Sequence, residues 1–302
     1  MPLHPDARAF LDKMGNVPQP NEIPIEEFRR AASAVITGGP PLEVGGVQDL
    51  TISGGDSKPM NIRIYRPEGA GPFPLLVWLH GGSFVRGTLD MFDAGRRAFT
   101  KASRCIVVAV DQRLSPEVKF PGPIQDGYAA LTWVSAHAAE FQGDPALIGV
   151  AGESSGANLA AALALMVKDK EGPKISFQLL IEPLLDAHCD TPSAAEFAEG
   201  YILTKRQLTW AYQQYAPNVS LDNPLLSPLR AADVEGLPPA VIVTIEYDPV
   251  RDDGEQYAAK LKAAGVRVLS ARIPGMLHHF AGPDLIPTSA RLLGELIRGE
   301  AS

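Results

Sequence analysis

The chain has few of the features that mark secreted, membrane-spanning or metal-clustered proteins. Only two of its 302 residues are cysteines, Cys105 and Cys189, so neither a disulfide framework nor a cysteine metal cluster is expected. The first residues contain no basic stretch followed by an apolar core, which a secretory signal requires. No apolar run reaches the roughly 20 residues of a membrane-spanning helix. We therefore expect a cytoplasmic protein without a membrane partner.

The charge distribution argues against nucleic acid and anionic lipid as partners. The chain has 35 acidic and 27 basic residues, a net charge of −8 and no run of lysine or arginine, whereas polyanions are bound by basic patches. The composition, 45% hydrophobic and 21% charged, is ordinary, and the length fits one large domain with a deep core. The oligomeric state does not follow from the sequence, with which a homodimer is compatible.

Apolar runs of strand length alternate with helix-like segments through most of the chain. Residues 75–79 and 106–110 are continuous apolar runs, as in strands covered on both faces, and residues 47–52 and 60–65 resemble an antiparallel hairpin at a sheet edge. The pattern predicts an α/β fold with a mostly parallel sheet and helices on both faces. Further strands are expected at 177–181, 240–245 and 266–273, and helices at 93–102, 124–139, 155–167, 253–264 and 288–297.

Two segments interrupt this alternation. Residues 1–45 have helical periodicity before the first strand, and residues 187–226 combine a polar loop with an aromatic-rich helical span. We expect both to form a helical cap over a core built from residues 46–186 and 227–302. The alternative for the second segment is an ordinary crossover helix with a long loop.

The sequence Gly-Glu-Ser-Ser-Gly at residues 152–156 has the pattern of a nucleophile elbow. An apolar run of strand length precedes it and an Ala/Leu-rich segment of helical composition follows it, to residue 167. In such a strand–turn–helix the central serine, Ser154, stands exposed above the sheet and the glycines let the backbone bend. The alternative is a glycine-rich turn with a solvated serine. Whether the other catalytic residues occur in the expected order distinguishes the two interpretations.

A candidate oxyanion hole precedes this motif. His-Gly-Gly-Ser at residues 80–83 directly follows the predicted strand 75–79. Backbone amides in such a glycine turn, together with the amide of Ser155, can point at the oxygen of a tetrahedral intermediate. The alternative is a tight turn in which His80 is a structural polar group.

A base and an orienting acid follow the motif in the order expected for this kind of site. Asp248 comes after the strand 240–245 and His278 after the strand 266–273, and parallel strands bring such positions to one edge of a sheet. His278 would take the proton of Ser154, and Asp248 would hold the imidazole tautomer.

Neighbouring residues leave two alternatives. Asp252 also lies near the end of that strand, although its place at the start of the next helix favours a capping role. His279 adjoins His278 and is expected to point elsewhere. A His-His pair without a further ligand set is poor evidence for a metal, and no metal site is expected.

Together these motifs resemble the bacterial hormone-sensitive-lipase family of carboxylesterases, an α/β-hydrolase group, over residues 75–280. The resemblance implies a triad of Ser154, Asp248 and His278, a two-part helical cap, no cofactor, and hydrolysis of small esters with short to medium acyl chains. The motifs that carry it are residues 80–83, Asp-Gln-Arg-Leu-Ser-Pro-Glu at 111–117 with Phe120, Pro121 and Asp126, residues 152–156, Asp-Pro-Val-Arg-Asp-Asp-Gly at 248–254, and Gly-Met-Leu-His at 275–278.

The resemblance also implies an oxyanion hole formed by the amides of Gly82, Ser83 and Ser155, with Gly81 shaping the turn. The chain departs from the usual pattern at Ser83, usually glycine, at Glu153, usually aspartate, and at Ser155, usually alanine. Because backbone amides are the donors, these departures put pocket shape and substrate preference in question rather than the chemistry. Gln112, in place of the usual tyrosine, concerns local packing.

Other functions of the same fold remain open. A lactonase, amidase or formamidase would use the same residues, a long-chain lipase would need a wide acyl channel, and the plant gibberellin receptors resemble this family but have lost the catalytic histidine, which is present here as His278. Large apolar cap residues are candidates for the pocket wall, although such residues are more often core. These candidates are Phe28, Phe197, Tyr201, Leu203, Trp210 and Phe280.

Overall fold

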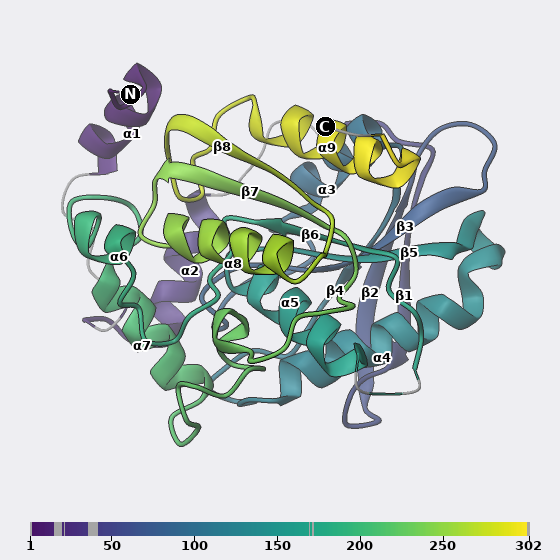
Figure 1. Cartoon of the computed structure of the whole chain (residues 1–302), viewed down its shortest axis with the longest axis horizontal. Coiled ribbons are helices and arrows are strands. Elements are labelled where there is room, and N and C mark those ends of the chain that lie inside the picture. Colours follow the sequence, from purple (N-terminus) through teal and green to yellow (C-terminus); the bar gives the residue numbers. More distant parts are fainter. Residues whose placement is uncertain are drawn as a thin grey trace.

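A mostly parallel sheet forms the centre of the molecule (Figure 1). The computed structural model describes residues 2–14, 20, 22–35, 42–168, 170 and 172–300, without the side chains of 31–35. Within these ranges eight strands pair in the order β1-β2-β4-β3-β5-β6-β7-β8. They are β1 (Gly46–Ser53), β2 (Pro59–Arg66), β3 (Phe73–Leu79), β4 (Ile106–Val110), β5 (Gly143–Glu153), β6 (Phe177–Ile181), β7 (Ala240–Tyr247) and β8 (Val268–Leu277).

The strand directions confirm the predicted fold class. β1 pairs antiparallel with β2, and β2 with β4, while the remaining neighbours are parallel. β1 lies at the edge and is largely exposed, whereas every residue of β4 is buried. The continuous apolar runs therefore belong to strands covered on both faces, as the sequence indicates.

Helices cover both faces of the sheet (Figure 1). On one face α3 (Asp93–Ser103) and α9 (Leu285–Arg298) pack against alternate strand residues such as Leu76 and Trp78. On the other face α4, α5 and α8 pack against residues such as Leu75. The Ala/Leu-rich α5 is buried from Ser155 to Leu165, so its high helix propensity is combined with an apolar surface all round. The bounds are α4 (Gly122–His137), α5 (Ser155–Lys168) and α8 (Arg251–Ala263), with the 3₁₀ turns η1 (Ala138–Phe141) and η2 (Pro228–Arg230).

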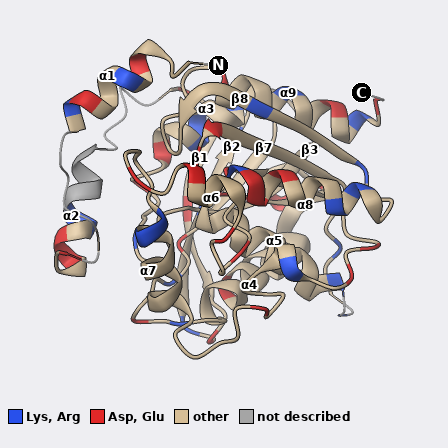
Figure 2. Cartoon of the chain, turned by 60° about the vertical axis from the view of Figure 1, so that its left-hand side comes forward, with Lys and Arg blue, Asp and Glu red and all other residues tan. Residues whose placement is uncertain are grey.

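Four further helices lie together on one side of the sheet (Figures 1 and 2). The Phe28 ring of α2 meets the Trp210 ring of α7 edge-on with centroids 5.7 Å apart, so the two segments outside the α/β alternation pack on each other. Residues 1, 15–19, 21 and 36–41 of the expected N-terminal cap portion lie outside the described residues. The four helices are α1 (Pro5–Met14), α2 (Ile25–Val35), α6 (Pro192–Glu196) and α7 (Lys205–Tyr215).

Charges are mixed over the molecule rather than gathered by sign. In Figure 2 acidic and basic residues are interspersed along the helices and loops, in keeping with the absence of a basic run in the sequence. Among the described helices, each is too short or too polar to cross a bilayer.

Candidate active site

Ser154 occupies a sharp turn between β5 and α5, as the strand–turn–helix pattern predicts. Its backbone has φ 53°, a left-handed conformation that costs energy for a residue with a side chain. The flanking glycines are needed for close approach: a Cβ at Gly152 would lie 2.2 Å from the Gly156 carbonyl oxygen, and one at Gly156 would lie 2.1 Å from the Leu79 carbonyl oxygen. The turn is therefore packed against the end of β3, and Ser154 is only 4% exposed.

The structure brings His278 and Asp248 to Ser154. The His278 Nε2 atom lies 2.9 Å from the Ser154 Oγ, and its Nδ1 atom lies 2.7 Å from the Asp248 Oδ2. All three residues follow parallel strands, β5, β7 and β8, whose carboxyl ends meet at one edge. β8 runs to Leu277, four residues past the predicted end of that strand, so His278 follows its strand directly.

The geometry favours Asp248 over Asp252. Asp248 is fully buried and also accepts a hydrogen bond from the Val250 amide at 2.9 Å. Asp252 lies in the first turn of α8, where it accepts from the Ser193 amide at 2.8 Å and pairs with Arg251. Asp252 thus bonds to α6 and to the neighbouring Arg251 rather than to His278.

Electrostatics prepare His278 to act as a base. Burial lowers the pKa of His278, but the carboxylates of Asp248 and Glu182 raise it more, so that the pKa lies above its ordinary value. Burial raises the pKa of Asp248, in opposition to its bond with His278. The bond between Nδ1 and Asp248 holds the proton on that nitrogen, which leaves Nε2 free to accept from the Ser154 hydroxyl.

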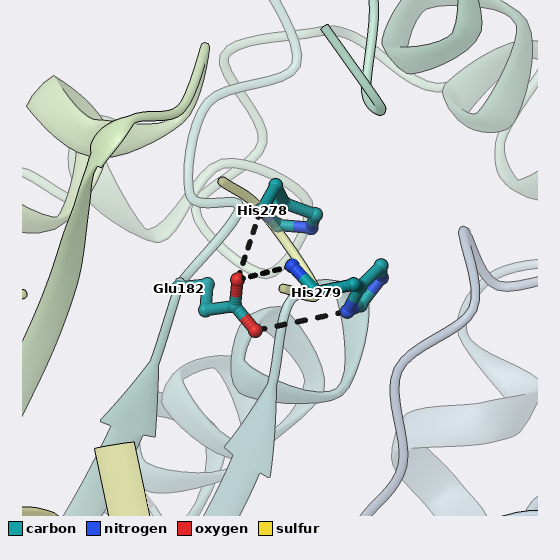
Figure 3. Close-up of side chains that lie close together, drawn as sticks. All are labelled: Glu182, His278 and His279. Atoms are coloured by element: carbon teal, nitrogen blue, oxygen red, sulfur yellow. Dashed lines mark hydrogen bonds and ion pairs between the residues drawn. The ribbon is translucent and has the colours of Figure 1, made fainter. Parts of the chain in front are cut away.

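Glu182 is a second carboxylate at this imidazole, and the sequence reasoning missed it (Figure 3). Its Oε2 atom lies 3.5 Å from the His278 Nδ1 and accepts a hydrogen bond from the His279 amide at 2.7 Å. Burial raises the pKa of Glu182, but the two histidines lower it to about 2. Glu182 directly follows β6, so the strand-end rule that selected Asp248 could also have selected it.

The prediction that His279 points away from His278 is wrong. The two rings lie 4.2 Å apart, and the His279 Nδ1 is 3.6 Å from the Glu182 Oε1. The reason is a tight turn: His279 has φ 60°, and Leu277 and Phe280 exchange backbone hydrogen bonds at 3.2 and 2.9 Å. The alternation of side chains between the two faces of the sheet therefore ends with β8 at Leu277, so His278 and His279 do not point in opposite directions.

The side chains of Glu182, His278 and His279 offer possible metal-ligand atoms within 4.8 Å of one another. A cation on His278, however, would compete with Ser154 for Nε2 or with Asp248 for Nδ1. Glu182 already pairs with both imidazoles and the His279 amide (Figure 3). The cluster is best described as charge pairing around a base rather than as a set of metal ligands.

Removing the charge of Glu182 is expected to shift the acidic limb of the pH–rate profile to lower pH. The variant Glu182→Gln keeps an oxygen that can accept from the His279 amide but removes a negative charge that stabilises protonated His278, whose pKa should fall by about one unit. The other charged groups facing His278 are Asp248, His279 and the cation Arg86, and the variant retains all of them.

The measurement is kcat/KM of an activated ester against pH. A half-buried glutamate on α8 provides a matched control, because Glu255→Gln removes a carboxylate that pairs with Arg272 instead. An acidic limb that stays in place in Glu182→Gln, or moves to higher pH, would contradict this electrostatic role.

The loop at residues 80–84, here called the glycine loop, presents free amides beside Ser154. Gly82, Ser83 and Phe84 have φ of 120°, 57° and 63°, so the chain turns back on itself. Over the described ranges, no residue accepts a hydrogen bond from the amides of Gly82, Ser83 or Ser155. Unused amides at this place fit the predicted oxyanion hole. Gly81 differs, because its amide donates to the Glu153 Oε1 at 3.1 Å.

Glu153 connects the serine turn to the glycine loop. Besides Gly81, it accepts from the Trp78 indole and pairs with Arg96 of α3 at 2.6 Å. The other departures from the usual pattern also make bonds here: the Ser155 Oγ accepts from the Phe84 amide at 3.1 Å, and the Ser83 Oγ accepts from Gln207 of α7 at 3.4 Å. Gln112 holds the loop from behind, since its Nε2 donates to the His80 carbonyl at 2.8 Å.

The predicted pocket-wall residues fall into separate groups. Phe28 packs with Trp210, whereas Phe197 packs with Tyr201 at a centroid distance of 5.2 Å. Leu203 is buried in the larger of the two cores. Phe280 stacks on Phe10 of α1, with centroids 4.5 Å apart. Contact of these residues with substrate stays a prediction.

Comparison with known proteins agrees with the fold and the motifs. A family profile described as alpha/beta hydrolase fold matches residues 76–282, more than half of the chain. The chain belongs to the alpha/beta hydrolase fold family. The resemblance to the hormone-sensitive-lipase group is thereby confirmed.

Several relatives of this alpha/beta hydrolase are named esterases. Carboxylesterase NlhH of Mycobacterium tuberculosis is 38% identical over 82% of this chain and 80% of its own length, and the arylesterase of Saccharolobus solfataricus is 34% identical over 93% of both. The carboxylic ester hydrolase LipN of M. tuberculosis is 39% identical, and this chain spans 66% of its length.

Solved structures of esterases superimpose closely on this alpha/beta hydrolase. An ester hydrolase from the metagenome of Lake Arreo, solved with a derivative of bipyridine phosphonate, has a TM-score of 0.93 and 35% identity, with 98% of this chain and 99% of the other covered. The hyperthermophilic esterase of Pyrobaculum calidifontis has a TM-score of 0.91 and 33% identity over the same shares.

Proposed function

We propose that this protein is a carboxylic ester hydrolase that forms an acyl-enzyme on Ser154. The observation that carries the proposal is the hydrogen-bonded series Ser154–His278–Asp248, with 2.9 and 2.7 Å between the atoms concerned. The names of the relatives agree with it. Free amides at Gly82 and Ser83 supply the complementary part, a place for the oxygen of a tetrahedral intermediate.

The proposed reaction has two halves. The Ser154 Oγ attacks the ester carbonyl carbon while its proton moves to the His278 Nε2, and the carbonyl oxygen takes up negative charge at the free amides. His278 then gives the proton to the leaving alkoxide as the carbon–oxygen bond breaks. Water, deprotonated by the same imidazole, hydrolyses the acyl-enzyme, and Asp248 stabilises the imidazolium in both halves.

The substrates proposed are small esters with short to medium acyl chains. The helices α1, α2, α6 and α7 would form a cap made of residues 1–45 and 187–226. The close packing of the serine turn leaves Ser154 4% exposed, so a long acyl chain would have to displace packed side chains. The protein would work in the cytoplasm, in keeping with two free and buried cysteines.

In a series of p-nitrophenyl esters from acetate to palmitate, kcat/KM is expected to be highest for short and medium chains and about tenfold or more lower for palmitate. Rates that rise toward palmitate would contradict the proposed substrate class. Lactones, amides and formamides in the same screen test the rival chemistries, which use the same residues. A receptor without turnover is disfavoured because His278 is present and touches Ser154.

The sequence leaves the oligomeric state open, and a homodimer is one of the states compatible with it. Size-exclusion chromatography with light scattering gives the mass in solution directly. A mass near 32.2 kDa would mean that the ester hydrolase works as a monomer.

A further inference from the structure

Arg86 lies two residues after the glycine loop, and its backbone and side chain pack against that loop. Its amide donates to the Gly82 carbonyl at 3.1 Å, which places it in the turn that shapes this loop. A Cβ at Gly82 would lie 2.9 Å from the Arg86 Cγ. The stem of this side chain therefore packs directly on a residue whose amide is assigned to the proposed oxyanion hole.

The guanidinium of Arg86 lies between the glycine loop and the cap helices. Its Cζ atom is 4.5 Å from the centroid of the Phe28 ring on α2, over the face of that ring. Phe28 in turn packs on Trp210 of α7. The charge also reaches the catalytic edge of the sheet, because Arg86 lowers the pKa of His278 and of His279.

Among the described residues, this cation has no acidic partner. Within the described part of the chain the Arg86 guanidinium makes no hydrogen bond and no ion pair, and it lies over the Phe28 ring. Burial lowers the pKa of Arg86 to about 10, so the group stays charged at neutral pH. The neighbouring arginines differ: Arg96 pairs with Glu153 at 2.6 Å, and Arg29 is bonded to Glu117 at 2.8 Å.

A partly buried charge without a counter-ion is unfavourable unless another molecule supplies one. A guanidinium presents a planar set of donors that fits a carboxylate in two parallel hydrogen bonds. We propose that Arg86 is the counter-ion for a carboxylate on the substrate, so that the enzyme prefers esters that carry a negative charge in their acyl or alcohol part. This inference rests on the ester hydrolase function proposed above and names its substrate class.

Two pairs of matched esters test the inference. In the acyl pair, the mono-4-nitrophenyl ester of adipic acid is compared with 4-nitrophenyl hexanoate, which has the same chain length without the carboxylate. In the alcohol pair, 3-carboxyphenyl butyrate is compared with phenyl butyrate. For each pair the readout is the ratio of kcat/KM for the charged ester to kcat/KM for the neutral one.

In at least one pair Arg86→Gln is expected to lower this ratio by roughly 10- to 100-fold, the size of a lost charge-assisted hydrogen bond. Arg86→Lys, which keeps the charge without the planar fork, should restore part of it. The control is Arg291→Gln on α9, an exposed arginine paired with Glu295, which should leave the ratio of the wild type unchanged. The pair that responds identifies the part of the ester that carries the carboxylate.

Equal losses on charged and neutral esters in both pairs would overturn the inference, because Arg86 would then act on the site as a whole. A ratio that does not change in either pair would also overturn it. In both cases hydrolysis of the neutral esters by the wild type would leave the proposed function standing. Hydrolysis of none of the four esters would contradict the ester hydrolase function itself and the inference with it.

Discussion

Replacing Ser154 with alanine is expected to lower kcat for a small p-nitrophenyl ester by about 10⁴- to 10⁶-fold. The variant keeps the free amides of the glycine loop but has no oxygen at 2.9 Å from the His278 Nε2 to become acylated. The fold should persist, because the change removes one small atom and alanine meets the same backbone conformation. Initial rates and thermal melting followed by circular dichroism give both quantities.

A second serine provides the control for this experiment. Ser176 directly precedes β6, at the opposite edge of the sheet, and its Oγ bonds to the Ala146 carbonyl at 2.8 Å. Ser176→Ala should therefore retain wild-type turnover. Intact-protein mass spectrometry after reaction with a 4-nitrophenyl phosphonate should find one adduct on the wild type and none on Ser154→Ala. Turnover close to wild type in Ser154→Ala would refute the acyl-enzyme on this residue.

The variant Asp248→Asn is expected to reduce kcat by about 10³- to 10⁴-fold. An amide at this position can donate to Nδ1, so the imidazole proton is driven to Nε2, where it blocks acceptance from the Ser154 hydroxyl. The nearby Glu182, 3.5 Å from Nδ1, offers a second acceptor for the correct tautomer. We therefore expect Asp248→Asn with Glu182→Gln to lose more activity than Asp248→Asn alone.

Asp252→Asn is the matched control for that experiment, since both aspartates lie in the same short segment after β7. It removes the charge that pairs with Arg251 but touches none of the atoms between Ser154 and Asp248. Its kcat should stay within a few-fold of the wild type, and its melting temperature reports any local loosening. A large loss in Asp252→Asn together with a small one in Asp248→Asn would reverse the assignment of the acid.

The central strands could be predicted closely because burial on both faces leaves an unmistakable apolar pattern. β4 and β6 begin and end where the sequence places them. The end of β8 could not be predicted, since Arg272, Pro274 and Gly275 interrupt the apolar run while the backbone continues as strand to Leu277. There the pairing with β7 shifts register next to Tyr247, and local composition does not encode that shift.

The site residues, like the strands, divide into those that a local sequence pattern predicts and those that only the folded structure brings together. Motifs that combine a strand end with glycine identify Ser154 and the glycine loop, because the turn itself demands glycine. Glu182 and His279 have φ of 45° and 60°. These are left-handed backbone conformations, which glutamate and histidine do not predict by their residue type. Glu182 and His279 contact His278 because of the way β6 and β8 end. Glu182 and His279 are almost one hundred positions apart in the sequence, so no local pattern predicts that they lie side by side.

The bridging carboxylate of Glu153 has a consequence for anyone redesigning this enzyme. Because one side chain ties Gly81 to the backbone of the attacking serine and rests on a buried guanidinium and an indole, the two halves of the reaction centre move as a unit. The substitution Glu153→Asp, which introduces the residue that is usual here, would shorten the side chain by one methylene. Its carboxylate would then lie too far from Arg96 and from the Gly81 amide to bond to both. Motif swaps at this position therefore call for matching changes on β3 and α3.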